Sequence, residues 1–246
     1  MIDSSCRGYC ARCETFHQLP QGNSYQYGLN LLQRIEEEGY IDFATCPECR
    51  DPGLKTEYLF GEARGKMFGV LECMTSEGTL TFLHGFSGQY NGRWLLNGWV
   101  GPLFDVDVWH TTNVEVEKEI KRLTGQINTG CADTIQITKL KETRKKLSRK
   151  LMKDIHSLYR LTNFRGETKE FSQLFPNNLP TGIGDCCAPK LLCHAAKNNL
   201  VPVSMAEFFV GKENRSGSKT HGQFYQACEE KCQPLLGFLL CGLDSV

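Results

Sequence analysis

Apolar residues recur along the chain at two periods, and the change from one to the other divides the sequence into regions. Near the N-terminus, Leu29, Leu32 and Ile35 recur at helical spacing and predict an amphipathic helix of about four turns. Further on, 66–73 and 78–88 are rich in β-forming residues, and a Ser-Glu-Gly turn joins them. These two segments therefore predict a β-hairpin that follows the helix.

A helical period replaces the strand pattern from Asn113 onward. Apolar residues then recur at helical spacing on both sides of a break at Gly130. They are Val116, Ile120, Leu123 and Ile127 before the break, and Leu140, Leu147, Leu151, Ile155 and Leu158 after it. We expect an antiparallel helical hairpin, either inserted into the α/β body or lying over it.

The second helix of this hairpin is strongly basic. From Lys139 to Arg160 the sequence holds nine Lys or Arg residues against two acidic residues, Glu142 and Asp154. A row of cations on one helix suits contact with RNA phosphates, although a Lys-rich helix is also typical of a solvated face. The candidate RNA-binding residues are Lys139, Lys141, Arg144, Lys145, Lys146, Arg149, Lys150 and Lys153.

The C-terminal part of the chain alternates between helix and strand. The apolar run 201–210 predicts a strand, and on each side of it lies a helical pattern that begins with cysteines. Thiols at both helix starts can meet around one metal ion, and thiolate is a preferred ligand of zinc. The cysteines concerned are Cys186, Cys187, Cys228 and Cys232.

Helix geometry narrows the choice of ligands for this C-terminal candidate zinc site. Cys228 and Cys232 stand at i and i+4, on one face of the predicted helix. The first turn of the other helix, where the dipole favours thiolate, offers either Cys186 or Cys187, and the sequence leaves that choice open. His221 is a further candidate ligand from the preceding loop. The alternative interpretation is that these cysteines are small buried core residues.

The N-terminal segment carries its own candidate zinc site. Two CxxC motifs aim pairs of thiols inward and predict a closed four-thiolate site made by Cys10, Cys13, Cys46 and Cys49. The spacer of 32 residues between the motifs contains the predicted helix, which we expect to fold back and close the site. The alternatives are unpaired surface thiols, or a ligand set that includes Cys6 or His17.

Composition narrows the class of protein. The chain has 246 residues, a formal net charge of zero and 13 cysteines. It shows neither a secretory signal nor an apolar stretch of membrane-spanning length, so we expect a cytoplasmic protein whose clustered cysteines bind metal. The expected regions are a zinc-knuckle segment at 1–53 and a β-hairpin part of the core at 54–112. A helical hairpin insertion at 113–162 and a cysteine-bearing helix–strand–helix part of the core at 163–246 follow.

The order of these elements resembles the cytidine-deaminase-like fold. In that family a His or Cys on one helix and a cysteine pair at the start of the next bind a zinc ion whose water attacks a nucleobase. The family's proton-carrying glutamate follows the first ligand by two residues, and the matching position here is Ala188 or Pro189. The second motif is C-x3-C where the family has C-x2-C. Glu207, within the apolar strand, is the candidate catalytic residue instead, with a structural role as the alternative.

Longer strings resemble a second family more closely. They are GKMFGVLEC at 65–73, GFSGQYNGRW and GWVGPLFDVD within 85–107, LSRKLMKDIHSLYRLTNFRGE at 147–167, TGIGDCCAPKLL at 181–192, AEFFVG at 206–211 and FYQACEEKCQPLLGFLLCGL at 224–243. Together they resemble the N-terminal region of long RluA-type pseudouridine synthases, which isomerise uridine in structured RNA. The family's catalytic Arg-Leu-Asp segment does not occur in this sequence. The resemblance therefore implies a role in holding RNA rather than the isomerase activity.

These observations predict an α/β protein with a deaminase-like α/β/α core, a helical hairpin insertion, an N-terminal zinc knuckle and one or two zinc ions. The leading functional hypothesis is a noncatalytic, zinc-stabilised accessory protein of RNA modification that binds RNA. One alternative is a divergent zinc-dependent deaminase or hydrolase that acts on a nucleobase. The other is a structural partner domain of a separate pseudouridine synthase.

Overall fold

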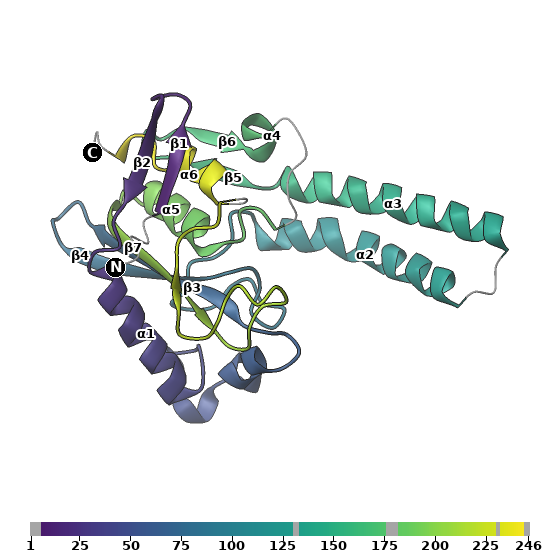
Figure 1. Cartoon of the computed structure of the whole chain (residues 1–246), viewed down its shortest axis with the longest axis horizontal. Helices are drawn as coiled ribbons and strands as arrows, with labels where there is room; N and C mark the ends of the chain where they lie inside the picture. Colours follow the sequence, from purple (N-terminus) through teal and green to yellow (C-terminus); the bar gives the residue numbers. More distant parts are fainter. Residues whose placement is uncertain (1–5, 130–132, 176–181, 230–231, 244–246) are drawn as a thin grey trace. The chain divides into compact units, whose positions relative to one another are not determined.

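Two compact units make up the chain, a mixed α/β protein (Figure 1). The computed structural model describes residues 6–129, 133–175, 182–229 and 232–243. The first unit, here called the body, takes its described residues from Met1–Leu103, Leu161–Thr168 and Gly182–Val246. The second, here called the hairpin unit, takes them from Phe104–Arg160 and Lys169–Thr181.

A four-stranded antiparallel sheet lies at the centre of the body. Its strands are, in spatial order, β4 (Leu80–Phe86), β3 (Lys66–Met74), β7 (Val201–Val210) and β8 (Phe224–Tyr225). β3 and β4 form the predicted hairpin, and β7 confirms the predicted strand. The pairing of β7 with β3 sets Gly69 opposite Glu207, so residues far apart in the sequence share the centre of one sheet.

Helices cover both faces of this sheet. α1 (Ser24–Glu38) confirms the first predicted helix, ends at Gly39 and packs on β3 and β7. On that face Phe68 and Phe208 are fully buried. Successive strand residues point to opposite faces, and the neighbouring Gly69 faces the start of α5 (Cys187–Lys197) instead. The body therefore has helix, sheet and helix layers.

A short β-hairpin precedes α1, although the sequence pattern did not predict strands there. β1 (Cys6–Cys10) and β2 (Thr15–Leu19) pair antiparallel, and every second residue of β1 is buried. The buried face packs on α6 (Gln233–Leu239). Backbone meets backbone in this contact, because Gly8 and Gly237 leave no room for a side chain on either side.

The hairpin unit confirms the predicted helical hairpin. α2 (Val106–Asn128) begins seven residues before Asn113, because the side chain of Asp105 accepts hydrogen bonds from two N–H groups of its first turn. Asp133 caps α3 (Thr134–His156) in the same way. The short α4 (Phe171–Leu174) belongs to the same unit. β5 (Arg160–Thr162) and β6 (Thr168–Glu170) form a two-stranded sheet where the chain passes between the units.

The remaining segments complete the core of the body. Three 3₁₀ helices lie between α1 and β3, at Pro47–Cys49, Pro52–Leu54 and Thr56–Phe60. The aromatic residues near the end of β4 are buried, namely Phe86, Tyr90, Trp94 and Trp99. Among the described residues, no helix combines the length and the apolar character that crossing a membrane requires.

The predicted start of the last helix is wrong. The i, i+4 spacing placed Cys228 and Cys232 on one helical face, whereas α6 begins at Gln233 with Cys232 as its N-cap residue. Cys228 precedes the helix in a turn, where its carbonyl oxygen accepts hydrogen bonds from the N–H groups of Cys232 and Gln233, both at 3.1 Å. A proline in the first turn favours this later start.

Gly237→Ala should destabilise the body, because the added Cβ would lie 1.8 Å from the carbonyl oxygen of Tyr9. Overpacking of this kind costs about 1–3 kcal/mol, and sometimes more. Gly61→Ala is the matched control, since the nearest atom to its new Cβ is 3.7 Å away, and we expect its effect to stay within about 0.5 kcal/mol. Urea unfolding followed by circular dichroism measures both variants. Equal stabilities would contradict the close contact of β1 with α6.

Candidate metal centres and a basic groove

Among the described residues of the body, two groups of side chains have the spacing of metal ligands. One consists of Cys10, Cys13, His17 and Cys241, and the other of Cys186, Cys228 and Cys232. Within each group all ligand atoms lie within 4.8 Å of one another. Both groups consist of soft ligands, which select zinc and other thiophilic metals over magnesium or calcium.

The first group joins the two ends of the described chain. Cys10 ends β1, Cys13 lies in the following turn and His17 is on β2, while Cys241 follows α6. Cross-strand pairing sets His17 opposite Gly8, so His17 and Cys10 share the buried face of the hairpin. Because that face packs on α6, it brings Cys241 within reach of the hairpin.

Sulfur–sulfur distances in the first group fit one tetrahedral ion. The Sγ atoms of Cys13 and Cys241 are 3.6 Å apart. Zinc–thiolate bonds of about 2.3 Å would place two thiolates of a tetrahedral site about 3.8 Å apart. A disulfide would bring the sulfurs to about 2.05 Å. The residues present therefore fit a bound metal ion rather than a disulfide.

The surroundings shift the pKa values of two thiols of the first group in opposite directions. Hydrogen bonds, the largest from His17 and the next from Cys241, lower the pKa of Cys13 to about 7. A thiol with this pKa is about half ionised at neutral pH, and the thiolate is the form that binds metal. Burial raises the pKa of Cys241. A cation at this position would stabilise the Cys241 thiolate.

The ligand set predicted for the N-terminal site is wrong in two members. Cys46 and Cys49 are exposed on a 3₁₀ turn and do not belong to either group of the described residues. The reason is that α1 is about 22 Å long and leads the chain away from the β1–β2 hairpin instead of folding back (Figure 1). His17, one of the alternatives, and Cys241 take their places. No CxxC spacing marks Cys241, so the sequence motif alone did not find it.

The geometry of the second group shows that Cys186, and not the adjacent Cys187, faces the other two cysteines. Cys186 is the N-cap residue of α5 and lies with Cys228 and Cys232. Cys187 is fully buried, and its thiol donates a hydrogen bond to the carbonyl oxygen of Met67 at 3.3 Å. The prediction that included Cys187 among the ligands is therefore wrong, because the first turn of α5 points it at β3.

Mutual contact and burial favour the protonated forms of Cys186 and Cys232 in the absence of a cation. The Sγ atoms of Cys228 and Cys232 are 3.4 Å apart. The contact with Cys228 raises the pKa of Cys186, and the contact with Cys186 raises that of Cys232, with burial adding to both shifts. A divalent ion reverses this balance, because it attracts the thiolates that otherwise repel one another.

Glu207 lies close to the second group but is engaged by the helix beside it. Its Oε1 atom accepts a hydrogen bond from the N–H of Ala188 at 3.1 Å, in the first turn of α5. Burial raises the pKa of Glu207 to about 7, and the negative charge of Cys228 adds to that effect. The carboxylate therefore caps α5 and holds the turn that carries Cys186.

His221, the further candidate ligand, forms hydrogen bonds outside both metal groups. Its Nδ1 atom accepts a hydrogen bond from the N–H of Gly211 at 3.1 Å, and its Nε2 atom lies 2.9 Å from the carboxylate of Glu36. Both ring nitrogens are thus committed, and His221 belongs to neither metal group of the described residues. The hydrogen bond between His221 and Glu36 instead ties the loop before β8 to α1.

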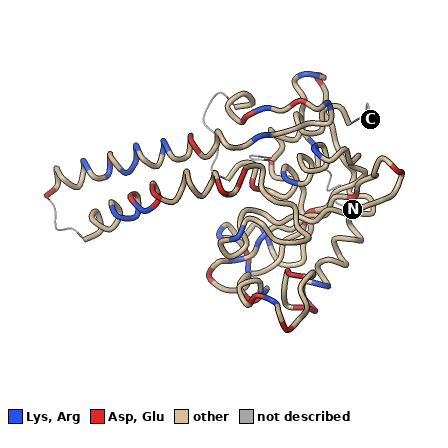
Figure 2. Tube along the Cα trace, turned by 180° about the vertical axis from the view of Figure 1, so that it is seen from behind, with Lys and Arg blue, Asp and Glu red and all other residues tan. Residues whose placement is uncertain are grey.

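A basic groove occupies the hairpin unit. It has a cavity volume of about 1380 Å³, and its apolar lining includes Ile120, Met152 and Phe175. Five of the eight candidate RNA-binding residues line it, namely Lys141, Arg144, Lys145, Arg149 and Lys153. At 1.5 Å per helical residue, this row of cations extends about 18 Å along α3. Figure 2 shows the basic residues spread along α3, while α2 carries both charges.

The positive charges of the groove are available to bind a ligand. None of the five forms an ion pair with a residue that the structure describes, whereas the off-groove Lys150 pairs with Asp154 at 2.7 Å. The acidic residues Glu115, Glu117 and Glu119 of the facing helix α2 pair with cations of α2 itself. The positive potential of the groove is therefore not cancelled from across the hairpin.

Comparison of the chain with protein-family models, with curated proteins and with solved structures yields no match. The resemblance to the N-terminal region of RluA-type pseudouridine synthases stays a prediction, as does RNA binding. The two metal groups and the basic groove are the features of the molecule that bear on its function.

The purified chain should hold two metal ions. Cys241→Ser takes a ligand from the first group and Cys228→Ser takes one from the second, so each variant should retain one ion. The double variant Cys46→Ser/Cys49→Ser is the control and should retain both. Elemental analysis by mass spectrometry measures the metal per chain. A lost ion in the double variant would restore the four-thiolate assignment of the N-terminal site.

Proposed function

We propose that this protein is a zinc-stabilised, RNA-binding accessory protein of RNA modification. The basic groove carries the proposal, because it gathers five cations without acidic partners among the described residues. A polyanion is the ligand that such a row of cations attracts most strongly. The resemblance to the RNA-holding region of RluA-type synthases supplies the setting of RNA modification.

RNA suits this groove better than an acidic protein segment. The cations recur along a nearly straight path on α3, which matches a ligand with a regular series of charges. The apolar lining at Met152 and Phe175 offers a surface for unstacked bases, and Phe175 adds an aromatic ring. The aromatic residues at the end of β4 play no such part, since they are buried.

Zinc is the metal that both cysteine groups favour. Three thiolates with an imidazole are a typical donor set of structural zinc sites, and three thiolates hold the zinc ion of some deaminases. The layers of the body and the thiols at the starts of α5 and α6 support a deaminase-like core. In this proposal the zinc ions stabilise the body, and the hairpin unit contacts RNA. A separate pseudouridine synthase is the partner that the resemblance implies.

Two triple variants of α3 test the RNA-binding proposal. Lys141, Lys145 and Lys153 line the groove, and all three change to Gln in the first variant. The control variant changes Lys139, Lys146 and Lys150, which do not line it, in the same way. The groove variant should lose affinity for a fluorescent stem-loop RNA, and its log–log salt slope should fall by about 2, since each single-strand contact contributes about 0.7.

The control separates a defined groove from general charge attraction. Fluorescence anisotropy over a range of salt concentrations measures the affinity of wild type and both variants. The control variant should keep most of the affinity, because its three lysines lie outside the groove. Equal losses in the two variants would contradict the groove, and an absence of salt-sensitive binding by the wild type would overturn the proposed function.

One observation favours a second candidate function, zinc-dependent deamination of a nucleobase. The second metal group offers three ligands among the described residues, and a tetrahedral zinc ion with three protein ligands keeps a position for water. The buried carboxylate of Glu207 lies beside this group. In a deamination, water would add to the base and ammonia would leave.

Ammonia release decides this second candidate. Zinc-loaded protein would be incubated with cytidine, adenosine and single-stranded oligonucleotides containing these bases. Release that depends on zinc, and that Glu207→Gln and Cys228→Ser each abolish, would establish the activity. Glu207→Gln retains an oxygen that can accept the hydrogen bond from Ala188, so it tests the carboxylate rather than the cap. No release from the wild type would exclude these substrates.

A further inference from the structure

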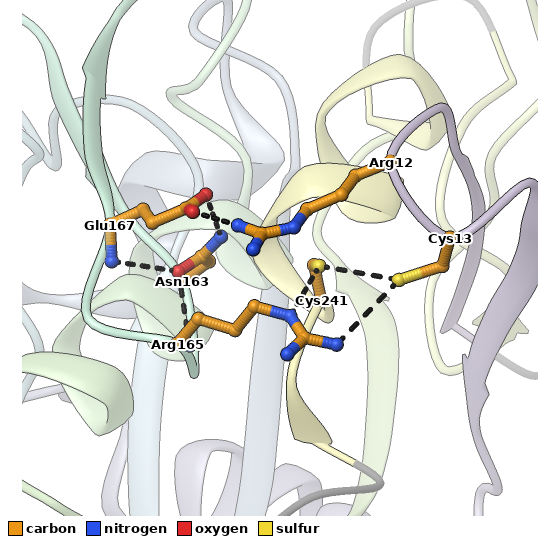
Figure 3. A network of polar contacts seen from close by, with 6 residues as sticks. All are labelled: Arg12, Cys13, Asn163, Arg165, Glu167 and Cys241. Carbon is orange, nitrogen blue, oxygen red and sulfur yellow. Dashed lines mark hydrogen bonds and ion pairs between the residues drawn. The ribbon is translucent and has the colours of Figure 1, made fainter.

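An arginine lies against two thiols of the first metal group. Arg165 comes from the loop between β5 and β6, far in the sequence from all four ligands. Its Nε atom donates a hydrogen bond to Cys241 Sγ at 3.3 Å, and its Nη2 atom contacts Cys13 Sγ at 3.8 Å (Figure 3). One guanidinium therefore bridges a cysteine of the N-terminal hairpin and a cysteine of the C-terminal segment.

The loop that carries Arg165 is itself fastened in place. The side-chain oxygen of Asn163 accepts hydrogen bonds from the N–H of Arg165 at 3.0 Å and of Glu167 at 2.9 Å. Gly166 closes the turn by donating to the carbonyl oxygen of Asn163. An ion pair between Glu167 and Arg12 then ties this loop to the turn between β1 and β2 (Figure 3). The turn formed by Asn163 and Gly166 thus sets the position of Arg165, whereas the exposed ion pair of Arg12 with Glu167 contributes little to it.

Space for the arginine depends on the residue after Cys241. Gly242 has a φ of +97°, a conformation that L side chains rarely adopt. A Cβ atom at this position would lie 2.5 Å from Cγ of Arg165 and 2.8 Å from its backbone nitrogen. The glycine lets the arginine pass directly over the backbone and reach the sulfur atoms.

The formal charges of a bound ion and its ligands show that the arginine supplies a balancing positive charge. Three thiolates around a divalent ion leave one net negative charge, because a neutral imidazole adds none. Cys10 and Cys241 are buried, with 3 % and 1 % of their surface exposed. An uncompensated charge is costly at such a position. One guanidinium within hydrogen-bond distance brings the total to zero.

We propose that Arg165 is the built-in counter-charge of a closed metal site made by Cys10, Cys13, His17 and Cys241. The proposal rests on the metal occupancy put forward above and adds a positioning residue that binds no metal itself. Four protein ligands leave no open position in a tetrahedral shell, so this site is structural. It joins the N-terminal hairpin, the β5–β6 loop and the segment after α6 within the body.

Zinc affinity of full-length variants tests the role of Arg165. Every protein compared, including the reference with Arg165 unchanged that is called wild type below, carries Cys228→Ser, so that only the first site is followed. Arg165→Met keeps the length of the side chain and removes its charge, and should weaken zinc binding about 10- to 100-fold, as loss of an outer-shell partner does. Arg165→Lys keeps the charge and should restore part of the affinity. Competition with a chromophoric chelator measures each value.

Arg12→Met is the matched control, because Arg12 belongs to the same network and its ion pair is with Glu167 rather than with the sulfur atoms. It should change the affinity by no more than about threefold, since it removes no contact to the thiols. Equal weakening by Arg12→Met and Arg165→Met would overturn the counter-charge. Wild-type affinity in Arg165→Met would overturn it as well.

Cobalt spectra separate failure of this inference from failure of the metal site. Wild type and Arg165→Met should both show the charge-transfer bands of thiolate-bound tetrahedral Co²⁺, because the ligands are unchanged. The variant should release its metal at a higher pH than the wild type, since protons compete better for uncompensated thiolates. A wild type without these bands refutes metal occupancy itself. Bands in both proteins with identical pH profiles refute only the role of Arg165.

Discussion

The contact between the backbones of β1 and α6 is the constraint on which the metal-binding part of the body depends. Because Gly8 and Gly237 carry no side chains, the N-terminal hairpin lies directly on the last helix. This contact fixes the distance from the hairpin ligands to Cys241, which follows the same helix. Cys232 is the N-cap residue of α6, so the placement of this helix against α5 also sets the second group.

The two metal groups differ in how complete they are, and the difference has a chemical meaning. The first has four ligands and an arginine against its sulfur atoms, an arrangement suited to holding structure together. The second has three thiols among the described residues and a carboxylate that caps the helix beside them. Stabilising the fold is a sufficient role for the first group. In the second group, a ligand from outside the protein can occupy the fourth position around a tetrahedral ion.

Local patterns predicted the elements well, and long-range contacts decided the sites. The periodicity of α3 and the alternation around β3 and β4 are local properties, so helix and hairpin followed from the sequence. The choice of Cys186 over Cys187 depended on which thiol the first turn of α5 points at β3. The exclusion of Cys46 depended on the direction in which α1 runs. Neither is encoded by spacing.

By itself the sequence determined the α/β class, the helical hairpin, the basic character of α3 and the presence of clustered thiols, because each follows from residue type and short-range period. Only the tertiary structure decided that Cys241 and His17 replace Cys46 and Cys49, that five of the eight candidate cations share one groove, and that Arg165 lies on the sulfur atoms. The physical reason is that a ligand set or a groove depends on distances between residues remote in the chain, which packing sets.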